Sequence, residues 1–280
     1  MIPVAFDYER ATSVEDAIAK LAASGGKAIA GGHSLVPLMK LRLSEPGKLV
    51  DISKIPGLSG IKEAGGKIEV GATTTHAEIA ASALLRDKCP ILAEAAAEIG
   101  DPQVRNRGTI GGSLAHADPA SDLPAVAIAL DADIHIKGKS GARTVKAAAF
   151  FRGFYDVDLA AGELIVAVSF APVRSAAYAK LHQRASHYAI VGAAVALDVT
   201  GGVIQSARIG ITGATTHAMR LTGVESALAG KKVDGIAAAV ASAADGIADL
   251  NADLHASADY RRAMIPVFVK RAIEKALGRG

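Results

Sequence analysis

The order of apolar patterns along the chain constrains its fold more than any other feature. Up to residue 172, short apolar runs typical of strands, such as KIEVGA (67–72) and ELIVAVSFAP (163–172), lie on either side of helical patterns such as PILAEAAAEIG (90–100). Beyond Val173 the patterns separate into a block of strands followed by a block of helices. This order predicts an α+β protein whose first and last parts are built differently.

The first residues are expected to form a unit of their own. SVEDAIAKLAAS (13–24) places apolar residues at helical spacing behind Ser13, a candidate cap, and the pattern ends at Gly25-Gly26. The apolar runs 27–30 and 49–52 flank this helix and are typical of short strands. We therefore expect a small β-α-β unit over residues 1–55 and a second α+β unit over residues 56–175.

The last part of the chain, residues 176–280, starts with strands. AYAKLHQRAS (177–186) and the segment 188–214 predict three strands, the second and third joined across Gly201-Gly202. Three helical patterns follow: RLTGVESALAG (220–230), VDGIAAAVASAADGIA (233–248) and ADYRRAMIPVFVKRAIEKAL (258–277). Pro266 is expected to interrupt or kink the last of these helices.

Length and composition bound the protein class. A chain of 280 residues is long enough for two or three compact units. Half of the residues are hydrophobic but only 4% are aromatic, which indicates close packing of small side chains, as where helices cover sheets. Basic residues outnumber acidic ones by only three, 31 against 28, and both are interspersed, so a nucleic-acid-binding surface is not indicated.

The chain has one cysteine, Cys89, so it can form no internal disulfide and cannot ligate an iron-sulfur cluster by itself. Any such cluster would belong to a partner. Charges at Asp7, Glu9 and Arg10 interrupt the start of the chain before a signal-peptide apolar region could form, and no apolar run approaches the ~18 residues of a membrane span. We expect a soluble, cytoplasmic protein without a transmembrane segment.

Two similar glycine-rich stretches stand far apart in the chain. AIAGGHSLVPL (28–38) and TIGGSLAHADPASD (109–122) each carry a glycine pair that leads into small hydroxyl residues. Glycine pairs allow positive φ and bring consecutive N–H groups to an anion without an intervening Cβ. Two facing loops of this kind would suit a pyrophosphate, and Ser34, Thr109 and Ser113 could add hydroxyl donors.

Other interpretations of these stretches stay open. Either loop taken singly also fits an ordinary tight connection, and neither has the GK[ST] ending of a P-loop or the GxGxxG spacing of a dinucleotide fold. His116, Asp118 and Asp122 could bind a divalent ion, but no second histidine lies at suitable spacing, so we assign no metal site. Asp122 is a candidate cap for the helix DLPAVAIAL, or it could accept hydrogen bonds from ligand hydroxyls.

The histidines and nearby basic residues give weaker signals. His33 either donates near a phosphate or faces solvent, and His76, in TTTHAEIA, lies near a helix start that the preceding threonines would cap. Lys180, His182 and Arg184 alternate along a predicted strand and would usually form its solvated face. No spacing fits a Ser-His-Asp triad or a carboxylate pair, so any catalysis is expected from a bound cofactor.

Taken together, four segments resemble a known family. They are AGGHSLVPLMKLRLSEPGKLVDI, TTTHAEIA, IGDPQVRNRGTIGGSLAHADPASDLPAVAIALDA and ESALAGKK. The resemblance, which covers essentially the whole chain, is to the FAD-binding medium subunit of molybdenum hydroxylases, the family of aerobic carbon monoxide dehydrogenase and xanthine dehydrogenase. It implies an α+β fold with a two-subdomain FAD-binding domain of the PCMH type (1–175), followed by a C-terminal domain (176–280) with a three-stranded antiparallel sheet and a helix bundle.

The resemblance also implies the cofactor contacts. The two glycine motifs would wrap the FAD pyrophosphate through Ala30, Gly31, Gly32, His33 and Ser34 and through Thr109, Ile110, Gly111, Gly112 and Ser113. Asp122 occupies an acidic position that contacts the cofactor in the family. Ile99 and Ile165 match apolar positions that line the flavin, Lys180 matches a basic position near it, and Tyr188 an aromatic one beside the isoalloxazine ring. Family members commonly read RA-x-[DF]-[WY] there, so His187 departs from the pattern. The cysteine insert of the benzoyl-CoA reductase branch is absent.

The implied function is electron transfer, as in a carbon monoxide dehydrogenase medium subunit. Substrate would be oxidised at a molybdenum cofactor on a large subunit, and electrons would pass through 2Fe-2S clusters on a small subunit to FAD and then to quinone or NAD. The assembly would be a dimer of heterotrimers, free in the cytoplasm or held at the inner face of the membrane through the complex. Two alternatives stay open: a self-sufficient flavin oxidase of a small organic substrate, and a non-catalytic nucleotide-binding subunit.

Overall fold

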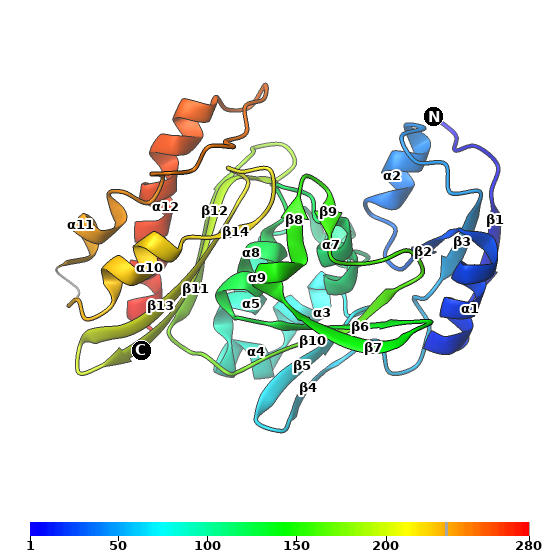
Figure 1. Ribbon diagram of the computed structural model, residues 1–280, viewed down its shortest axis with the longest axis horizontal. Coiled ribbons are helices and arrows are strands. Elements are labelled where there is room, and N and C mark those ends of the chain that lie inside the picture. The colour runs from blue at the N-terminus through cyan, green and yellow to red at the C-terminus, as the bar shows by residue number, and fades with distance from the viewer. Residues whose placement is uncertain (233–234, 280) are drawn as a thin grey trace.

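The computed structural model describes residues 1–232 and 235–279, and three main sheets follow one another along its long axis (Figure 1). The first unit contains β1 (Asp7–Arg10), α1 (Val14–Ser24), β2 (Lys27–Ile29), α2 (Leu35–Lys40) and β3 (Lys48–Asp51). Its strands are parallel and lie in the order β1-β3-β2. The predicted β-α-β unit is confirmed.

Local sequence signals account for the bounds of α1. The Ser13 hydroxyl accepts a hydrogen bond from the N–H of Asp16, and Gly25, with φ +62°, closes the helix by donating its N–H to the carbonyl of Leu21. Ala17, Ile18 and Leu21 are buried on one face and pack in a core with Val50 of β3.

The second unit is built on an antiparallel sheet in the order β4-β5-β10-β6-β7. Its strands are β4 (Ile61–Ala64), β5 (Lys67–Gly71), β6 (Asp133–Gly138), β7 (Gly141–Lys146) and β10 (Leu164–Phe170). Its helices are α3 (His76–Ala81), α4 (Ala83–Lys88), α5 (Pro90–Ala97), α6 (Pro102–Arg105), α7 (Ile110–His116), α8 (Asp122–Ala129) and α9 (Ala147–Phe150). The short strands β8 (Phe151–Gly153) and β9 (Asp156–Val157) pair with each other.

The third unit contains an antiparallel sheet of three long strands, as predicted, and a fourth, two-residue strand that the apolar pattern does not reveal. The strands are β11 (Ala176–His182), β12 (Ala189–Thr200), β13 (Val203–Thr212) and β14 (Met219–Arg220). The helices are α10 (Thr222–Leu228), α11 (Ile236–Val240) and α12 (Ala258–Leu277).

Two helix predictions need correction. Within the predicted helix 233–248, whose first two residues lie outside the described part, α11 is confined to Ile236–Val240. α12 is one continuous helix through Pro266, so the proline does not interrupt it. A proline inside a helix costs a hydrogen bond, but the buried side chains of Ile265, Phe268 and Val269 tie both sides of Pro266 to the core of this unit.

The sheet of the third unit is covered on both faces (Figure 1). Helices α5 and α8 of the second unit contact one face, and α10 and α12 contact the other. Small residues allow this close approach: a Cβ on Gly210 of β13 would lie 2.3 Å from the carbonyl oxygen of Ala125 in α8. The predicted packing of small side chains between helices and a sheet is therefore confirmed, and it places β13 against α8 and β11 against α5.

Candidate functional site

The two glycine motifs touch each other. A Cβ built on Gly31 would lie 2.0 Å from the carbonyl oxygen of Arg107 and 3.0 Å from the Cα of Gly108. Gly108 immediately precedes Thr109, so the first motif packs directly against the start of the second. The expectation that the two segments face each other is confirmed.

The first motif presents a row of free backbone donors. Gly32 has φ +75°, a conformation that favours glycine, and Ser34 leads into α2. Within the described chain, the N–H groups of residues 31–35 donate to no acceptor. His33 is exposed, and its Nδ1 lies 3.3 Å from the carbonyl oxygen of Gly31. Consecutive unpaired N–H groups in a half-exposed turn suit an anion, which needs several donors at once.

The second motif is the first turn of helix α7, whereas the sequence suggested a loop. The hydroxyl of Thr109 accepts a hydrogen bond from the N–H of Gly112 at 3.1 Å. The N–H of Ile110 donates to the carbonyl of Thr74, and that of Gly111 to the carbonyl of Ala72. The N–H groups of residues 110–112 are thus already hydrogen-bonded within the protein, so they are not free to bind an anion. This motif can still form a wall beside a ligand.

The two glycines of the second motif have different environments. Gly111 is buried, and a Cβ there would lie 2.7 Å from the Cβ of Ala72 and 2.8 Å from its carbonyl oxygen. Gly112 is exposed, and its Cβ would meet only the hydroxyl of Thr109. Next to it, the hydroxyls of Ser113 and Ser121 form a 2.7 Å hydrogen bond at the half-buried edge of the same surface. Gly111 therefore serves packing, and Gly112 keeps the surface open.

A buried ion pair lies where β11 meets α8. Both carboxylate oxygens of Asp122 lie 2.9 Å from Nζ of Lys180, whose side chain has no exposed surface. The hydroxyl of Tyr178 donates to Oδ1 of Asp122, and Nζ of Lys180 also donates to the carbonyl oxygen of Glu98 at 3.0 Å. Burial raises the pKa of Asp122, and the nearby Lys180 charge and Tyr178 hydroxyl oppose that rise.

The surroundings of this pair correct two predictions. Lys180 does not lie on a solvated face, because the sheet carries helices on both sides and residue 180 points toward α8. Asp122 does not cap α8, because it is the first residue of the helix and Ser121 occupies the cap position. Nor is its carboxylate free for ligand hydroxyls, since Tyr178 and Lys180 occupy both oxygens.

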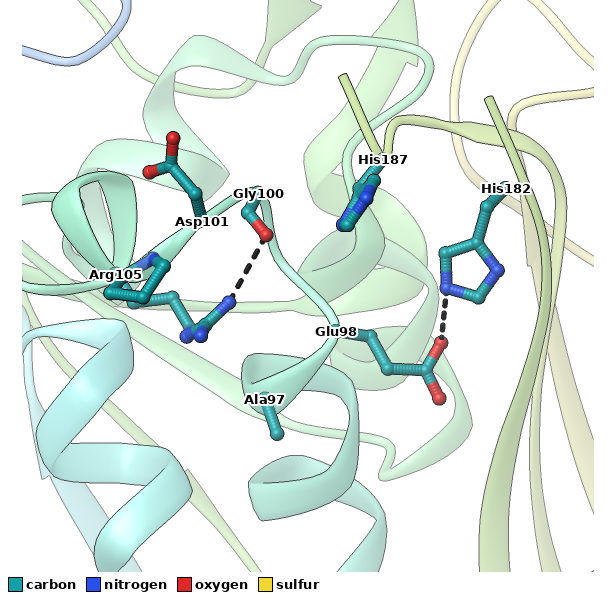
Figure 2. A pocket seen from close by; sticks show the side chains of 8 residues that line it. Ala97, Glu98, Gly100, Asp101, Arg105, His182 and His187 are labelled. Atoms are coloured by element: carbon teal, nitrogen blue, oxygen red, sulfur yellow. Dashed lines mark hydrogen bonds and ion pairs between the residues drawn. The ribbon is translucent and has the colours of Figure 1, made fainter. Parts of the chain in front are cut away.

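A cavity of about 510 Å³ opens beside the buried pair, between the loop after α5 and the end of β11 (Figure 2). Its lining consists of Ala97, Glu98, Gly100, Asp101, Pro102, Arg105, His182 and His187. Nε2 of His182 lies 3.1 Å from Oε2 of Glu98, within ion-pair distance although not aligned as a hydrogen bond. Arg105 holds the loop by donating to the carbonyls of Ile99 and Gly100.

Burial shifts the pKa values of Glu98 and His182 in opposite directions. It raises the pKa of Glu98, which the Lys180 charge opposes and the Asp122 charge reinforces. It lowers the pKa of His182, with the charges of Lys180 and His187 acting in the same direction. The sequence analysis did not single out Glu98 or assign His187 a role; the signal for Glu98 was a carboxylate directly after the apolar helix 90–97.

The remaining predicted residues lie around this region with different exposure. Ile165 is buried in β10, and Ile99 packs at the edge of the core of the second unit. Tyr188 is half-exposed on the turn that joins β11 to β12, where His187 has the left-handed φ of +60°. Burial raises the pKa of the Tyr188 hydroxyl, and the charges of Asp118 and Asp122 raise it further.

His76 lies beneath the point where the two motifs meet. It is buried at the start of α3, and a Cβ on Gly108 would lie 2.8 Å from its Nε2. The predicted cap is confirmed, because Thr75 and Glu78 form a reciprocal capping box at this helix.

The described residues contain neither a cluster of metal ligands nor a membrane-spanning helix. Among residues 1–232 and 235–279, no three His, Cys, Asp or Glu side chains are grouped so that they could hold a metal ion. Over the same two ranges, every helix is too short or too polar to cross a membrane.

Comparison with protein families divides the chain into two matched parts. Residues 4–172 match the model described as FAD binding domain in molybdopterin dehydrogenase. Residues 176–276 match the CO dehydrogenase flavoprotein C-terminal domain.

Full-length relatives match throughout. The carbon monoxide dehydrogenase medium chain of Hydrogenophaga pseudoflava is 42% identical over 285 residues, which cover all of this chain and 99% of the relative. Subunit alpha of the 6-hydroxypseudooxynicotine dehydrogenase complex of Paenarthrobacter nicotinovorans is also 42% identical, over all of this chain and 97% of its own length. Among solved structures, carbon monoxide dehydrogenase from Hydrogenophaga pseudoflava lacking the Mo-pyranopterin moiety superposes with a TM-score of 0.95 at 41% identity, over 100% of this chain and 99% of that one.

Proposed function

The chain belongs to the family of FAD-binding medium subunits of molybdenum hydroxylases, an oxidoreductase flavoprotein family, and from this premise we propose that it transfers electrons from iron-sulfur clusters of a small subunit, through FAD, to an external acceptor. When bound, FAD can accept electrons singly and release them as a pair, which suits it to this junction. The protein binds and orients the cofactor and sets its electrostatic surroundings.

The observation that supports this proposal best is the row of unpaired N–H groups at residues 31–35, pressed against the second motif through Gly31 and Arg107. This arrangement fits the pyrophosphate of FAD, which needs several donors at once. We propose that Ala30, Gly31, Gly32, His33 and Ser34 hold the pyrophosphate mainly through backbone N–H groups. Thr109, Ile110, Gly111, Gly112 and Ser113 would then form the opposite wall, where Gly112 leaves room and Ser113 adds a hydroxyl.

The flavin ring would lie toward the junction of the second and third units. We propose that Ile99, Ile165 and Tyr188 line it and that the Lys180 ammonium contributes a nearby positive charge. In this arrangement Asp122 acts through Lys180, because its carboxylate already binds Lys180 and Tyr178.

The partners follow from the names of the relatives, which are medium chains or subunits of dehydrogenase complexes. We propose a large subunit with a molybdenum cofactor, a small subunit with 2Fe-2S clusters, and a dimer of such heterotrimers. The acceptor would be quinone or NAD, and the complex would be cytoplasmic, free or bound at the inner face of the membrane. We propose that the large subunit decides the substrate; the 42% identity of this chain to subunits of both a carbon monoxide and a 6-hydroxypseudooxynicotine dehydrogenase supports this.

The proposed domain division is 1–175 for FAD binding, with subdomains meeting near residue 55, and 176–280 for the C-terminal flavoprotein domain. The change of sheets supports it, since β3 ends at Asp51, β4 begins at Ile61, and β10 and β11 lie on either side of residue 175.

Two measurements test the proposal. The purified chain should be yellow or become yellow when FAD is added, and a chain that stays colourless would contradict any flavin function. The native complex should contain molybdenum and iron in addition to flavin. A lone flavoprotein that oxidises an organic donor would instead favour a self-sufficient oxidase.

A further inference from the structure

Electron transfer through this subunit creates a need for protons, and this inference rests on the proposed function. Iron-sulfur clusters pass electrons without protons, whereas two-electron reduction of the flavin takes up at least one: FAD + 2e⁻ + H⁺ → FADH⁻. The same proton must leave when the acceptor removes the electron pair. The chain that binds FAD therefore needs a group that exchanges protons with water near the flavin ring.

The buried groups at the junction of the second and third units do not meet this need by themselves. The Asp122 carboxylate is paired with Lys180 and Tyr178, and the Lys180 ammonium also donates to the Glu98 carbonyl. Lys180, Asp122 and Tyr178 are not among the residues that line the cavity. A proton-transfer group must contact both this buried region and solvent.

Glu98 and His182 meet both conditions. Glu98 holds Lys180 through its carbonyl and directs its carboxylate toward His182 (Figure 2). The His182 side chain is 42% exposed and that of Glu98 27%, and both line the 510 Å³ cavity. We propose that Glu98 and His182 form a proton-transfer pair that connects water in this cavity with the flavin.

The position of this pair agrees with the proposed flavin site. Glu98 immediately precedes Ile99, and His187, whose ring lies edge-to-face with that of His182 at a centroid distance of 5.9 Å, immediately precedes Tyr188. Ile99 and Tyr188 are the residues proposed to line the ring, so the cavity opens at its edge.

The electrostatics favour proton exchange within the pair. Burial moves the pKa of Glu98 upward and that of His182 downward, so the two values approach each other. The charged groups that face the pair are Lys180 and Asp122 from the buried side and His187, Asp101 and Arg105 from the cavity. Oε2 of Glu98 is buried and has no aligned hydrogen-bond partner. A buried carboxylate whose role is to stabilise the fold normally has such partners.

The proton balance is simple. During flavin reduction a proton passes from the Glu98–His182 pair to the flavin and is replaced from water in the cavity. During oxidation by the acceptor, the proton returns by the same route. Neither residue changes its oxidation state, and both act on the flavin as proton carriers.

The test uses the full chain loaded with FAD. Reduced methyl viologen supplies single electrons in a stopped-flow instrument, flavin absorbance reports reduction, and a pH-indicator dye in weakly buffered solution reports proton uptake. The variants are Glu98→Gln and His182→Gln, each close in size to the original residue, together with His182→Ala, which leaves room for added imidazole. His135→Gln, which replaces a hydrogen-bonded histidine on β6 outside the cavity, is the matched control.

We expect proton uptake to slow by about 100-fold in Glu98→Gln and in His182→Gln, the low end of the range for general acid-base catalysis, with FAD affinity and midpoint potential retained. The control should match the wild type, and added imidazole should restore the rate of His182→Ala, because a free imidazole can enter the cavity. Since His182 is half-exposed, its replacement leaves the core intact even if Glu98→Gln disturbs the loop.

The overturning results are distinct. Wild-type rates of proton uptake in His182→Gln and in Glu98→Gln, with FAD bound, would refute the proton-transfer pair and leave the electron-transfer function standing. A slowed rate in His182→Ala that imidazole does not restore would also refute it. Failure of the wild-type chain to bind FAD would refute the proposed function, and this inference with it.

Discussion

Gly31 packs so closely on Arg107 that a Cβ at position 31 would lie 2.0 Å from the Arg107 carbonyl oxygen. The two residues are 76 positions apart in the sequence, and their contact holds the first glycine motif against the start of the second. On one side of this contact lie the free N–H groups of residues 31–35, and on the other the exposed Gly112. We propose that the FAD pyrophosphate binds between these two groups of residues.

Gly112→Leu should abolish FAD retention without unfolding the protein. Its side chain would enter the exposed surface where the pyrophosphate is proposed to bind, and only the Thr109 hydroxyl lies close to the new Cβ. Equilibrium dialysis with FAD and circular dichroism measure the two effects. Gly223→Leu is the matched control, because Gly223 is also an exposed first-turn helix glycine and a Cβ there meets nothing within 4 Å. Retention of FAD by Gly112→Leu would place the cofactor elsewhere.

Gly111→Ala should lower the stability of the fold but leave FAD binding intact, the opposite of Gly112→Leu. Its Cβ would overlap with Ala72, so we expect the free energy of unfolding of the FAD-free chain to fall by about 1–3 kcal/mol. FAD should still bind to the fraction that folds. Urea denaturation checks the first effect and FAD titration at low urea the second; unchanged stability would mean that Gly111 does not pack as described.

Lys180→Met should be strongly destabilising, because it leaves the Asp122 carboxylate buried with only Tyr178 as a hydrogen-bond partner. Removing one partner of a buried pair typically costs about 3–5 kcal/mol. The double variant Lys180→Met/Asp122→Asn should recover a large part of this loss, since a neutral amide can still accept from Tyr178. Urea denaturation of the two variants tests this, and equal losses in both would show that the charge is not the cause.

His76 should make the folded protein less stable in acid. Burial, with the charge of His33, lowers its pKa from 6.5 to about 4. Between these values the unfolded chain binds a proton that the folded chain does not, so the free energy of unfolding falls as the pH drops from 6.5 to 4. This pKa shift corresponds to a contribution of roughly 3 kcal/mol to the free energy of unfolding. The contribution is complete above pH 6.5 and is lost as the pH falls to 4.

The check is urea denaturation of the FAD-free chain at pH 7 and pH 4. His76→Gln should lose less stability between these pH values than the wild type, and His255→Gln, a change at an exposed histidine, should behave like the wild type. An identical loss in His76→Gln and wild type would show that His76 is not the group responsible.

Much of the fold follows from local patterns in the sequence. The cap at Ser13, the end of α1 at Gly25 and the hairpin across Gly201-Gly202 depend on short-range geometry, so the apolar periodicity and the glycines suffice to find them. β14 has only two residues, too few for an apolar pattern to reveal it. Whether α12 continues through Pro266 depends on packing in the core of the third unit, which a local pattern does not show either.

The candidate site was predictable only in part. The glycine pairs identified the anion-binding surface, but the sequence could not show that the N–H groups of 110–113 are already paired, because their acceptors come from residues 72, 74 and 109. Lys180 looked solvated because an alternating strand usually has one solvent-exposed face, whereas here α5 packs on β11 and the Lys180 side chain is paired with Asp122 of α8. Glu98 meets His182 only after the second and third units pack together, whereas His187 reaches His182 across the turn between β11 and β12.

The most direct measurement of the central claim is a titration of the purified chain with FAD, followed by flavin fluorescence, with ADP and riboflavin as competitors. We expect saturation at one FAD per chain, competition by ADP, which carries the pyrophosphate, and negligible competition by riboflavin, which does not. Absence of FAD binding, or riboflavin competing as well as ADP, would contradict a pyrophosphate site between the two glycine motifs.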